Sequence, residues 1–240
     1  MSEANSREVV HRRFAATAAL LAGFEEAHRA ALAADVREFV APRIDERALD
    51  VGAGTGALAF ALAPIVREVV AVELVHECIR EGRARAAAFP NVAFLAGDAT
   101  RLAFRDASFD LAGCLRTLHH VDAPERAIAE LARVTRAGGH VLIVDQLAPA
   151  DRTQALAFER FERARDPSHC RCLPDSDLRE LFAANRFVVA AARIREETRE
   201  LQGYLDRAGC EGEARRAAAA LAPGPAFPIM MGWYLLTRPA

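Results

Sequence analysis

The residues best suited to chemistry gather around one glycine-rich segment. Residues 48–56 read ALDVGAGTG, so a short apolar run is followed directly by three closely spaced glycines. Glycine adopts backbone angles that other residues avoid, and it lets a ligand approach bare peptide N–H groups. We therefore expect a buried strand, a tight turn and a helix, with a nucleotide-like ligand lying on the turn. The expected contacts are Asp50, Gly52, Ala53, Gly54 and Gly56.

The turn alone leaves the ligand open. Gly52, Gly54 and Ala57 also satisfy the looser dinucleotide pattern G-x-G-x-x-[GA]. A strand-to-helix turn without any ligand would need similar glycines. The choice between these alternatives depends on the residues that follow.

Three acids near the ends of successive apolar runs favour a cationic ligand. Asp50 precedes the glycines, where an anion would repel the pyrophosphate of a dinucleotide but suit a cationic amino-acid group. Glu73 lies where it can bind two ribose hydroxyls, which would fit NAD equally well. Asp98, within Gly97-Asp98-Ala99, can accept from an adenine amino group. Helix capping or solvation would explain each acid singly, but together they favour S-adenosylmethionine over NAD.

Two adjacent histidines are candidates for the chemistry of methyl transfer. Displacement at a sulfonium methyl neutralises charge, so alignment and the exclusion of water provide much of the rate. A base is needed only if the accepting atom must lose a proton, and His119 or His120 could supply it after the fourth predicted strand. In the plainer interpretation, one histidine packs beneath the cofactor and the other caps a helix.

A loop from residue 165 to 174 carries further candidates. His169 joins the two earlier histidines as a catalytic candidate, and Arg165 and Asp166 are expected either to orient or cover a substrate or only to hold the loop. Cys170 and Cys172 flank this histidine closely, but they lack the C-x₂-C spacing of structural zinc sites, so we predict no metal.

The alternation of apolar runs and Ala-rich stretches predicts the elements that position these residues. It is typical of an α/β fold, a Rossmann-like, mostly parallel sheet with helices on both faces. Strands are expected near 47–51, 66–73, 92–97, 108–114, 140–146, 186–195 and 230–237. Helices are expected near 56–63, 75–89, 123–136 (ended by Gly138-Gly139), 151–165, 175–185 and 198–221. An N-terminal helical extension covers about 5–41, with a joint at Gly23.

In this order the motifs resemble the class I S-adenosylmethionine-dependent methyltransferases, in particular the ubiquinone/menaquinone-biosynthesis-like (type 11) group acting on small molecules. The motifs are LDVGAGTG (49–56), VVAVE (69–73), GDA (97–99), LAFRDASFD (102–110), LHHV (118–121), ELARVTRAGGHVLIVD (130–145) and RDPSH (165–169). The resemblance implies seven strands with the last antiparallel. It also implies donor contacts at Asp50, Gly52, Gly54, Glu73, Leu74, Asp98, Ala99 and the segment Cys114-Leu115-Arg116.

The resemblance covers about residues 45–195, and the N-terminal helical part departs from it. We expect a helical cap at 1–44 and a Rossmann-like methyltransferase domain at 45–240, with 147–185 as a lid or substrate insertion. The expected activity is methyl transfer to a C, O or N atom of a small-molecule acceptor. The alternatives are an NAD-linked oxidoreductase and a non-catalytic S-adenosylmethionine-binding protein.

Composition narrows the partners and the compartment. A chain of 240 residues with a net charge of −2 can bury one large core and lacks the basic field expected of a nucleic-acid partner. No run approaches 18 apolar residues, so no membrane segment is expected. Five irregularly spaced cysteines predict free thiols and a cytoplasmic location. The sequence is compatible with a homodimer.

Overall fold

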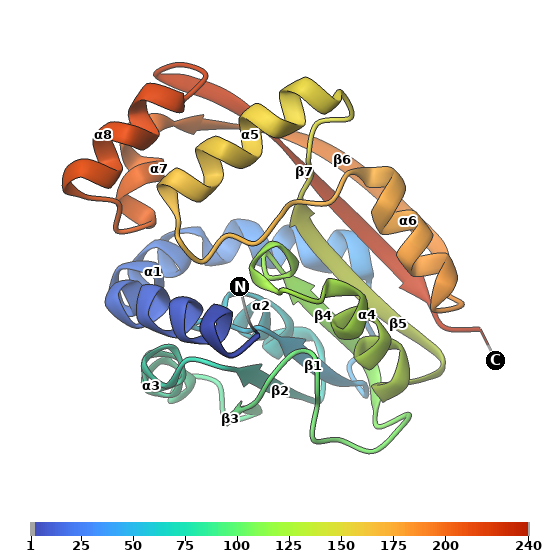
Figure 1. Cartoon of the computed structure of the whole chain (residues 1–240). Helices are drawn as coiled ribbons and strands as arrows, with labels where there is room; N and C mark the ends of the chain where they lie inside the picture. The colour runs from blue at the N-terminus through green and yellow to red at the C-terminus, as the bar shows by residue number, and fades with distance from the viewer. Residues whose placement is uncertain (1–2, 240) are drawn as a thin grey trace.

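A single seven-stranded sheet organises the chain in the computed structural model, which describes residues 3–239 (Figure 1). The strand order is β3-β2-β1-β4-β5-β7-β6. Strands β1 to β5 are parallel, whereas β7 is antiparallel to both β5 and β6. The strands are β1 (Arg47–Val51), β2 (Glu68–Glu73), β3 (Val92–Ala96), β4 (Phe109–Leu115), β5 (Thr135–Gln146), β6 (Val188–Glu200) and β7 (Ala226–Thr237). The predicted fold, with its antiparallel last strand, is confirmed.

Helices cover both faces of this sheet and form two main cores, beside a small apolar cluster around Ala18 and Cys78. Neighbouring residues of β1 contribute to different cores, Ala48 to one and Leu49 to the other, because side chains alternate across a strand. The first core includes residues of α1, α2, α5, α7 and α8, and the second includes those of α4 and α6 (Figure 1). The helices are α1 (Glu3–Val40), α2 (Ala57–Leu62), α3 (His76–Ala86), α4 (Pro124–Val134), α5 (Arg152–Arg165), α6 (Asp175–Ala184), α7 (Leu201–Arg207) and α8 (Gly212–Leu221).

The N-terminal extension is one long helix. The backbone stays helical over the 38 residues of α1, so the joint expected at Gly23 is not a break. Figure 1 shows instead that α1 changes direction along its length, and the helix packs against α2 and α3. A side chain at Gly23 would meet nothing within 4 Å, so packing does not require this glycine.

Two predicted helix boundaries are wrong. Helix α4 ends at Val134, not at Gly138-Gly139, because β5 already begins at Thr135 and pairs there with Phe109 of β4. The helix expected over 198–221 begins later, since β6 continues to Glu200 and pairs with Ala226. It is then split into α7 and α8. Gly209, between the two helices, and Gly212, the first residue of α8, adopt left-handed backbone angles.

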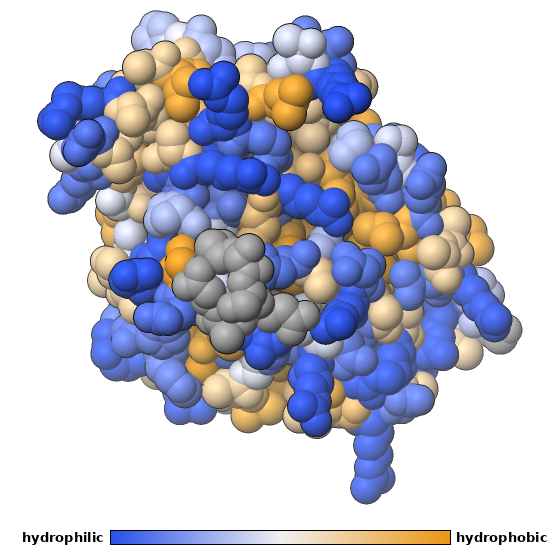
Figure 2. Space-filling model, in the orientation of Figure 1, coloured by the Kyte–Doolittle hydropathy of each residue, from blue (hydrophilic) through white to orange (hydrophobic). Residues whose placement is uncertain are grey.

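The surface mixes residue types. On the face shown in Figure 2, hydrophilic residues dominate and hydrophobic ones lie in smaller groups between them. The large exposed apolar side chains come from separate elements, for example Leu20 of α1, Leu95 of β3 and Leu156 of α5. Among residues 3–239, no helix combines the length and apolar character that crossing a membrane requires.

Candidate functional site

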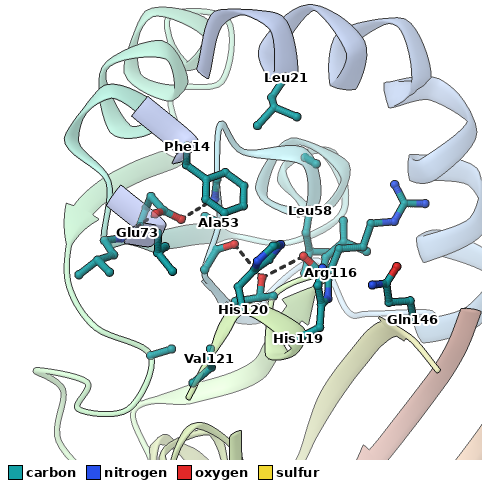
Figure 3. Close-up of a pocket in the computed structure, with 18 of the residues that line it drawn as sticks. Phe14, Leu21, Ala53, Leu58, Glu73, Arg116, His119, His120, Val121 and Gln146 are labelled. Carbon is teal, nitrogen blue, oxygen red and sulfur yellow. Dashed lines mark hydrogen bonds between the residues drawn. The ribbon is translucent and has the colours of Figure 1, made fainter. Parts of the chain in front are cut away.

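One large cavity of about 530 Å³ lies at the carboxyl edge of the sheet. Parallel strands end at the same edge, so the turn after β1 and the ends of β2, β3 and β4 converge there. Helix α1 forms the opposite wall, contributing side chains such as Phe14 and Leu21 (Figure 3). The predicted chemistry-bearing segments therefore meet at one place.

The glycine turn is closed on one side and open on the other. Gly52 has a φ of +67°, and a Cβ there would lie 2.1 Å from the methyl carbon of Thr117. The Thr117 hydroxyl lies 3.0 Å from the carbonyl oxygens of Gly52 and Leu115, which ties the turn to the end of β4. At Gly54, with a φ of +56°, a Cβ would meet only Glu25, at 3.8 Å. The open side is where a ligand can approach the peptide backbone.

Asp50 is a buried acid with one unused oxygen. Its Oδ2 accepts a 2.9 Å hydrogen bond from the N–H of Ala59, which fixes α2 to β1. Its Oδ1 is buried and has no hydrogen-bond partner among the described residues. Burial raises the pKa of Asp50 to about 8. A cationic group in the cavity would satisfy this side chain, whereas the pyrophosphate of a dinucleotide would not.

Glu73, at the end of β2, shapes the turn from the other side. Its carboxylate accepts hydrogen bonds from the N–H groups of Gly54, Leu74 and Val75 at 2.8 to 2.9 Å. Burial raises its pKa, and these three donors partly offset the effect. The oxygens keep lone pairs that can accept from sugar hydroxyls. Glu73 therefore has a structural role that its position in the sequence did not indicate.

Asp98 is already partly engaged by the protein. Its Oδ1 accepts from the backbone N–H and the hydroxyl of Thr100, both at 2.8 Å. Its Oδ2 lies 2.7 Å from the guanidinium of Arg7 on α1. An adenine amino group bound here would share Oδ2 with Arg7, so the adenine-binding role of Asp98 stays a prediction.

Most of the predicted donor contacts line the cavity. They are Asp50, Gly52, Ala53, Gly54, Glu73, Leu74, Gly97, Asp98, Ala99, Leu115 and Arg116. Gly56 and Cys114 do not line it. Gly56 serves as the N-cap of α2. Cys114 packs into the core beneath α4, because its side chain points to the face opposite that of Leu115.

The predicted histidines occupy three different environments. His119 is buried, and its Nδ1 lies 2.5 Å from Oδ1 of Asp145, so the proton on Nδ1 leaves Nε2 as the basic nitrogen. The Nδ1 of His120 lies 3.0 Å from the Ser168 hydroxyl. Burial and the neighbouring His119 lower the pKa of His120 well below its usual range, so it stays neutral. Both rings line the cavity (Figure 3).

His169 is not brought to the cavity. Its side chain is fully buried, and its Nε2 lies 3.1 Å from Glu159 of α5. The same carboxylate accepts from the N–H of Cys172 at 2.7 Å, so it holds the loop after α5 against the helix. The side-chain atoms of Glu159, His169 and Cys172 that could bind a metal ion lie within 4.8 Å of one another. The spacing of the cysteines in the sequence did not indicate this grouping. The hydrogen bonds of Glu159 with His169 and Cys172 explain why these side chains lie together, because they hold the loop after α5 against the helix.

Arg165 and Asp166 both line the cavity but are held in an internal network. Asp166 pairs at 2.7 Å with Arg13 of α1, and its Oδ1 accepts from the Ser168 hydroxyl at 2.6 Å. Arg165 pairs at 2.6 Å with Glu162. The contacts of Asp166 support the loop-holding alternative for that residue, whereas the pair of Arg165 with Glu162 lies within α5.

The sequence interpretation missed several wall residues. Glu25 of α1 lies 2.5 Å from the hydroxyl of Thr55, which connects the helix to the glycine turn. Arg13 and Phe14 of α1, Thr117, and Gln146 at the end of β5 also line the cavity. The N-terminal helix carries no recognisable motif, so the sequence offered no local signal for its wall residues.

Comparisons with known proteins agree with this geometry. Residues 49–143 match the family described as "Methyltransferase domain". The chain is 36% identical over 146 residues to the uncharacterized methyltransferase YcgJ of Bacillus subtilis, covering 60% of this chain and 58% of that protein. It is 38% identical over 150 residues to a demethylmenaquinone methyltransferase of Renibacterium salmoninarum, covering 62% and 59%. The chain thus matches about three fifths of the length of these curated relatives.

Solved structures share the fold over most of the chain. The crystal structure of the YcgJ protein from Bacillus subtilis superposes with a TM-score of 0.83 at 25% identity, covering 87% of this chain and 98% of that one. A putative methyltransferase from Bacillus halodurans has a TM-score of 0.80 at 24% identity, covering 87% and 99%. The second likeness supports the fold alone.

Proposed function

We propose that the chain transfers a methyl group from S-adenosylmethionine to a C, O or N atom of a small-molecule acceptor, because residues 49–143 match the methyltransferase-domain family and the fold is that of a YcgJ methyltransferase. The observation that carries the proposal is the set of acids around the glycine turn. Asp50 offers a buried, unpartnered oxygen, and Glu73 and Asp98 follow at the next two strand ends. This arrangement suits a cationic donor and disfavours the pyrophosphate of NAD.

Each end of the donor would meet a suitable group. Asp50 and the open side of Gly54 would hold the amino-acid end, with Leu115 and Arg116 alongside. Glu73 would accept from the ribose hydroxyls, and Asp98 with Ala99 would contact the adenine. Leu74 and Gly97 would line the space between them.

The bound donor supplies an electrophilic methyl group on a sulfonium, and the protein's residues align the acceptor and exclude water. Helix α1 covers the cavity and limits the access of solvent. Where the acceptor must lose a proton, Nε2 of His119 or the neutral ring of His120 can take it. The carboxylate of Asp145 would stabilise the charge formed on His119. His169 lies outside the cavity and would act only by holding the loop.

We assign residues 1–44 as the cap of this site and 147–185 as its lid. Arg13 of the cap and Asp166 of the lid form a buried pair, which supports treating the two segments as one cover. The partner is a small molecule, since a net charge of −2 gives no general attraction to nucleic acid. The five free cysteines support a reducing, cytoplasmic location.

Ligand-induced stabilisation tests the proposal against its alternatives. S-adenosylhomocysteine at 100 times its Kd should stabilise the folded protein by about 2.7 kcal/mol, measured as a rise in Tm. NADH at the same concentration serves as the matched control and should leave the Tm unchanged. Stabilisation by NADH alone would favour the oxidoreductase and defeat the proposal. Binding without formation of S-adenosylhomocysteine from S-adenosylmethionine, across acceptors that include quinols, catechols and amines, would favour a non-catalytic protein.

A further inference from the structure

Beyond the glycine turn the cavity continues between α1, β6 and α7, and this extension has its own character. Its apolar walls are formed by Leu21, Phe24, Leu32, Met231 and Trp233. Three arginines enter the same space, Arg116 after β4, Arg199 on β6 and Arg207 at the end of α7. We call these three residues the arginine cluster.

The direction and register of β6 explain how its arginine reaches the cavity. Strand β6 is antiparallel to β7, which is antiparallel to β5, so β6 ends at the same edge of the sheet as the glycine turn. From Arg193 onward, alternate residues of β6 are half-buried and face α1 or the cavity. Arg193 and Arg195 pair with Glu38 and Asp35 of α1. Arg199 lies on the same face of β6, four residues after Arg195, and has no such partner on α1 among the described residues.

Few carboxylates lie near the arginine cluster to balance its positive charge. Arg116 and Arg199 share one carboxylate oxygen, Oε2 of Glu197, at 3.2 and 2.5 Å. Within the part of the chain that the structure describes, no carboxylate lies within ion-pair distance of Arg207. The guanidinium of Arg207 instead lies over the rings of Phe24 and Tyr204, at 4.8 and 5.5 Å from their centroids. Three guanidinium groups therefore face a single carboxylate.

The surrounding groups do not supply the missing charge. Tyr204 is buried beside the cluster, and its hydroxyl lies 3.0 Å from Glu162. That glutamate is already paired with Arg165, which stacks on the Tyr204 ring at 4.0 Å. Burial and the proximity of Arg199 lower the pKa of both Arg116 and Arg207, as expected for uncompensated positive charge.

Two buried donors in the same region also lack partners. The amide nitrogen of Gln146 and Nε of Arg199 make no hydrogen bond within residues 3–239. Gln146 lies beside Arg116 at the edge of the cavity (Figure 3). Buried donors are normally paired, so unpaired ones at a cavity wall indicate an acceptor that arrives with a ligand.

We propose that the arginine cluster binds an anionic group, a carboxylate or a phosphate, on the methyl acceptor, while the apolar walls hold the acceptor's hydrophobic or aromatic body. The inference rests on the proposed function, since it assigns the acceptor to this end of the cavity. Guanidinium groups bind such oxyanions through paired N–H donors. The acceptor class is therefore an apolar or aromatic acid.

The donor's own carboxylate is the competing occupant. Arg116 follows β4 directly and lies beside the expected amino-acid end of the donor, so it borders both ligands. Arg199 and Arg207 belong to β6 and α7, which contribute none of the predicted donor contacts. Arg207 is therefore the residue that separates the two interpretations.

Matched probes test the assignment by calorimetry in the presence of saturating S-adenosylhomocysteine. We expect 2-naphthoate or 2-naphthyl phosphate to bind at least about tenfold more tightly than the uncharged 2-naphthamide. Arg207→Met should abolish this preference without changing the affinity for S-adenosylhomocysteine. Arg207→Lys, which keeps the charge, should retain part of it. Arg80→Met, at an exposed arginine of α3, is the control and should bind all probes like the wild type. Comparison of the two anions shows which oxyanion is preferred.

The same titrations distinguish failure of this inference from failure of the proposed function. Equal binding of charged and neutral probes, or an unchanged preference in Arg207→Met, would overturn the inference. A loss of S-adenosylhomocysteine binding in Arg207→Met would assign the cluster to the donor and overturn it as well, leaving the proposed function intact. If the wild type did not bind S-adenosylhomocysteine at all, the proposed function itself would fail.

Discussion

At the scale of single residues, Asp50 couples ligand chemistry to stability. The residue is buried at the wall of the cavity, and only one of its oxygens has a partner among the described residues. A buried acid of this kind prefers its neutral form in the empty protein. A cation bound beside it would favour the charged form. The side chain therefore lowers the stability of the empty folded protein but favours the binding of a cationic donor.

Asp50→Asn tests this view through pH. The pKa of Asp50 is about 8 in the folded protein and roughly 3.9 in an unfolded chain. Between these values the folded state holds a proton that the unfolded chain has lost, so wild-type stability should fall as the pH rises. The asparagine can still accept from Ala59 and does not titrate. Its stability relative to the wild type should therefore increase, by up to roughly 1.4 kcal/mol per pH unit between pH 5 and 8.

Urea unfolding at several pH values measures the difference. Asp45→Asn is the control, because Asp45 is exposed and its pKa is lowered by Arg43, so its ionisation does not change in this range. A difference between Asp50→Asn and wild type that stays constant from pH 5 to 8 would contradict the assignment.

At the scale of elements, α1 is part of the site as well as its cover. Among its polar contacts, three tie it to segments that line the cavity: Arg7 to Asp98, Glu25 to Thr55 and Arg13 to Asp166. The last pair is buried on both sides, with side chains 8% and 0% exposed. Burial acts to raise the pKa of Asp166, but the charges of Arg13 and Arg165 and the hydrogen bond from Ser168 lower it by more, so the carboxylate stays charged. The pair therefore ties the helix to the loop after α5.

Removing Arg13 should release this tie. Arg13→Met leaves Asp166 charged and buried without its main partner, so the free energy of unfolding should fall by about 3–5 kcal/mol. The double variant Arg13→Met/Asp166→Asn should recover part of the loss, because the uncompensated charge is gone. Arg29→Met, which removes an exposed pair with Glu26 on the same helix, should change stability by less than about 1 kcal/mol. Equal losses in Arg13→Met and the double variant would show that the unpaired charge of Asp166 is not the cause of the loss.

At the scale of the whole molecule, the cavity is the place where distant parts of the chain meet. Its walls come from α1 near the start of the chain, the strand ends in the middle, and β6 with α7 near the end. A ligand that contacts several of these walls binds only when they are assembled. Binding should therefore suppress local opening in all of them together.

Hydrogen exchange followed by mass spectrometry can detect this coupling. Saturating S-adenosylhomocysteine should slow amide exchange in α1 and in the segments around Gly54 and Asp98. Helix α6 should exchange at an unchanged rate, because none of its residues lines the cavity. Protection confined to the glycine turn, with α1 unaffected, would show that the helix is not part of the donor site.

The sequence allowed the donor end of the site to be predicted, because local rules govern it. Glycines fix the turn after β1, and strands rich in branched residues place Asp50, Glu73 and Asp98 at successive ends of a parallel sheet. The predicted helix boundaries were wrong where strand pairing, rather than the local sequence, determines the secondary structure. Gly138-Gly139 reads as a helix end but lies in β5, since its partner β4 extends the ladder. Residues 198–200 read as helix but pair with β7.

The sequence by itself thus determined the α/β fold and the residues beneath the donor, since short spacings and strand ends specify both. Only the tertiary structure decided the other walls. Arg13 and Asp166 are 153 positions apart yet form one buried pair, and Arg116, Arg199 and Arg207 converge from three elements. His169 lies next to promising residues in the sequence, but the packing of α5 turns it away from the cavity. Contacts between distant segments depend on how elements pack, and no local spacing encodes that packing.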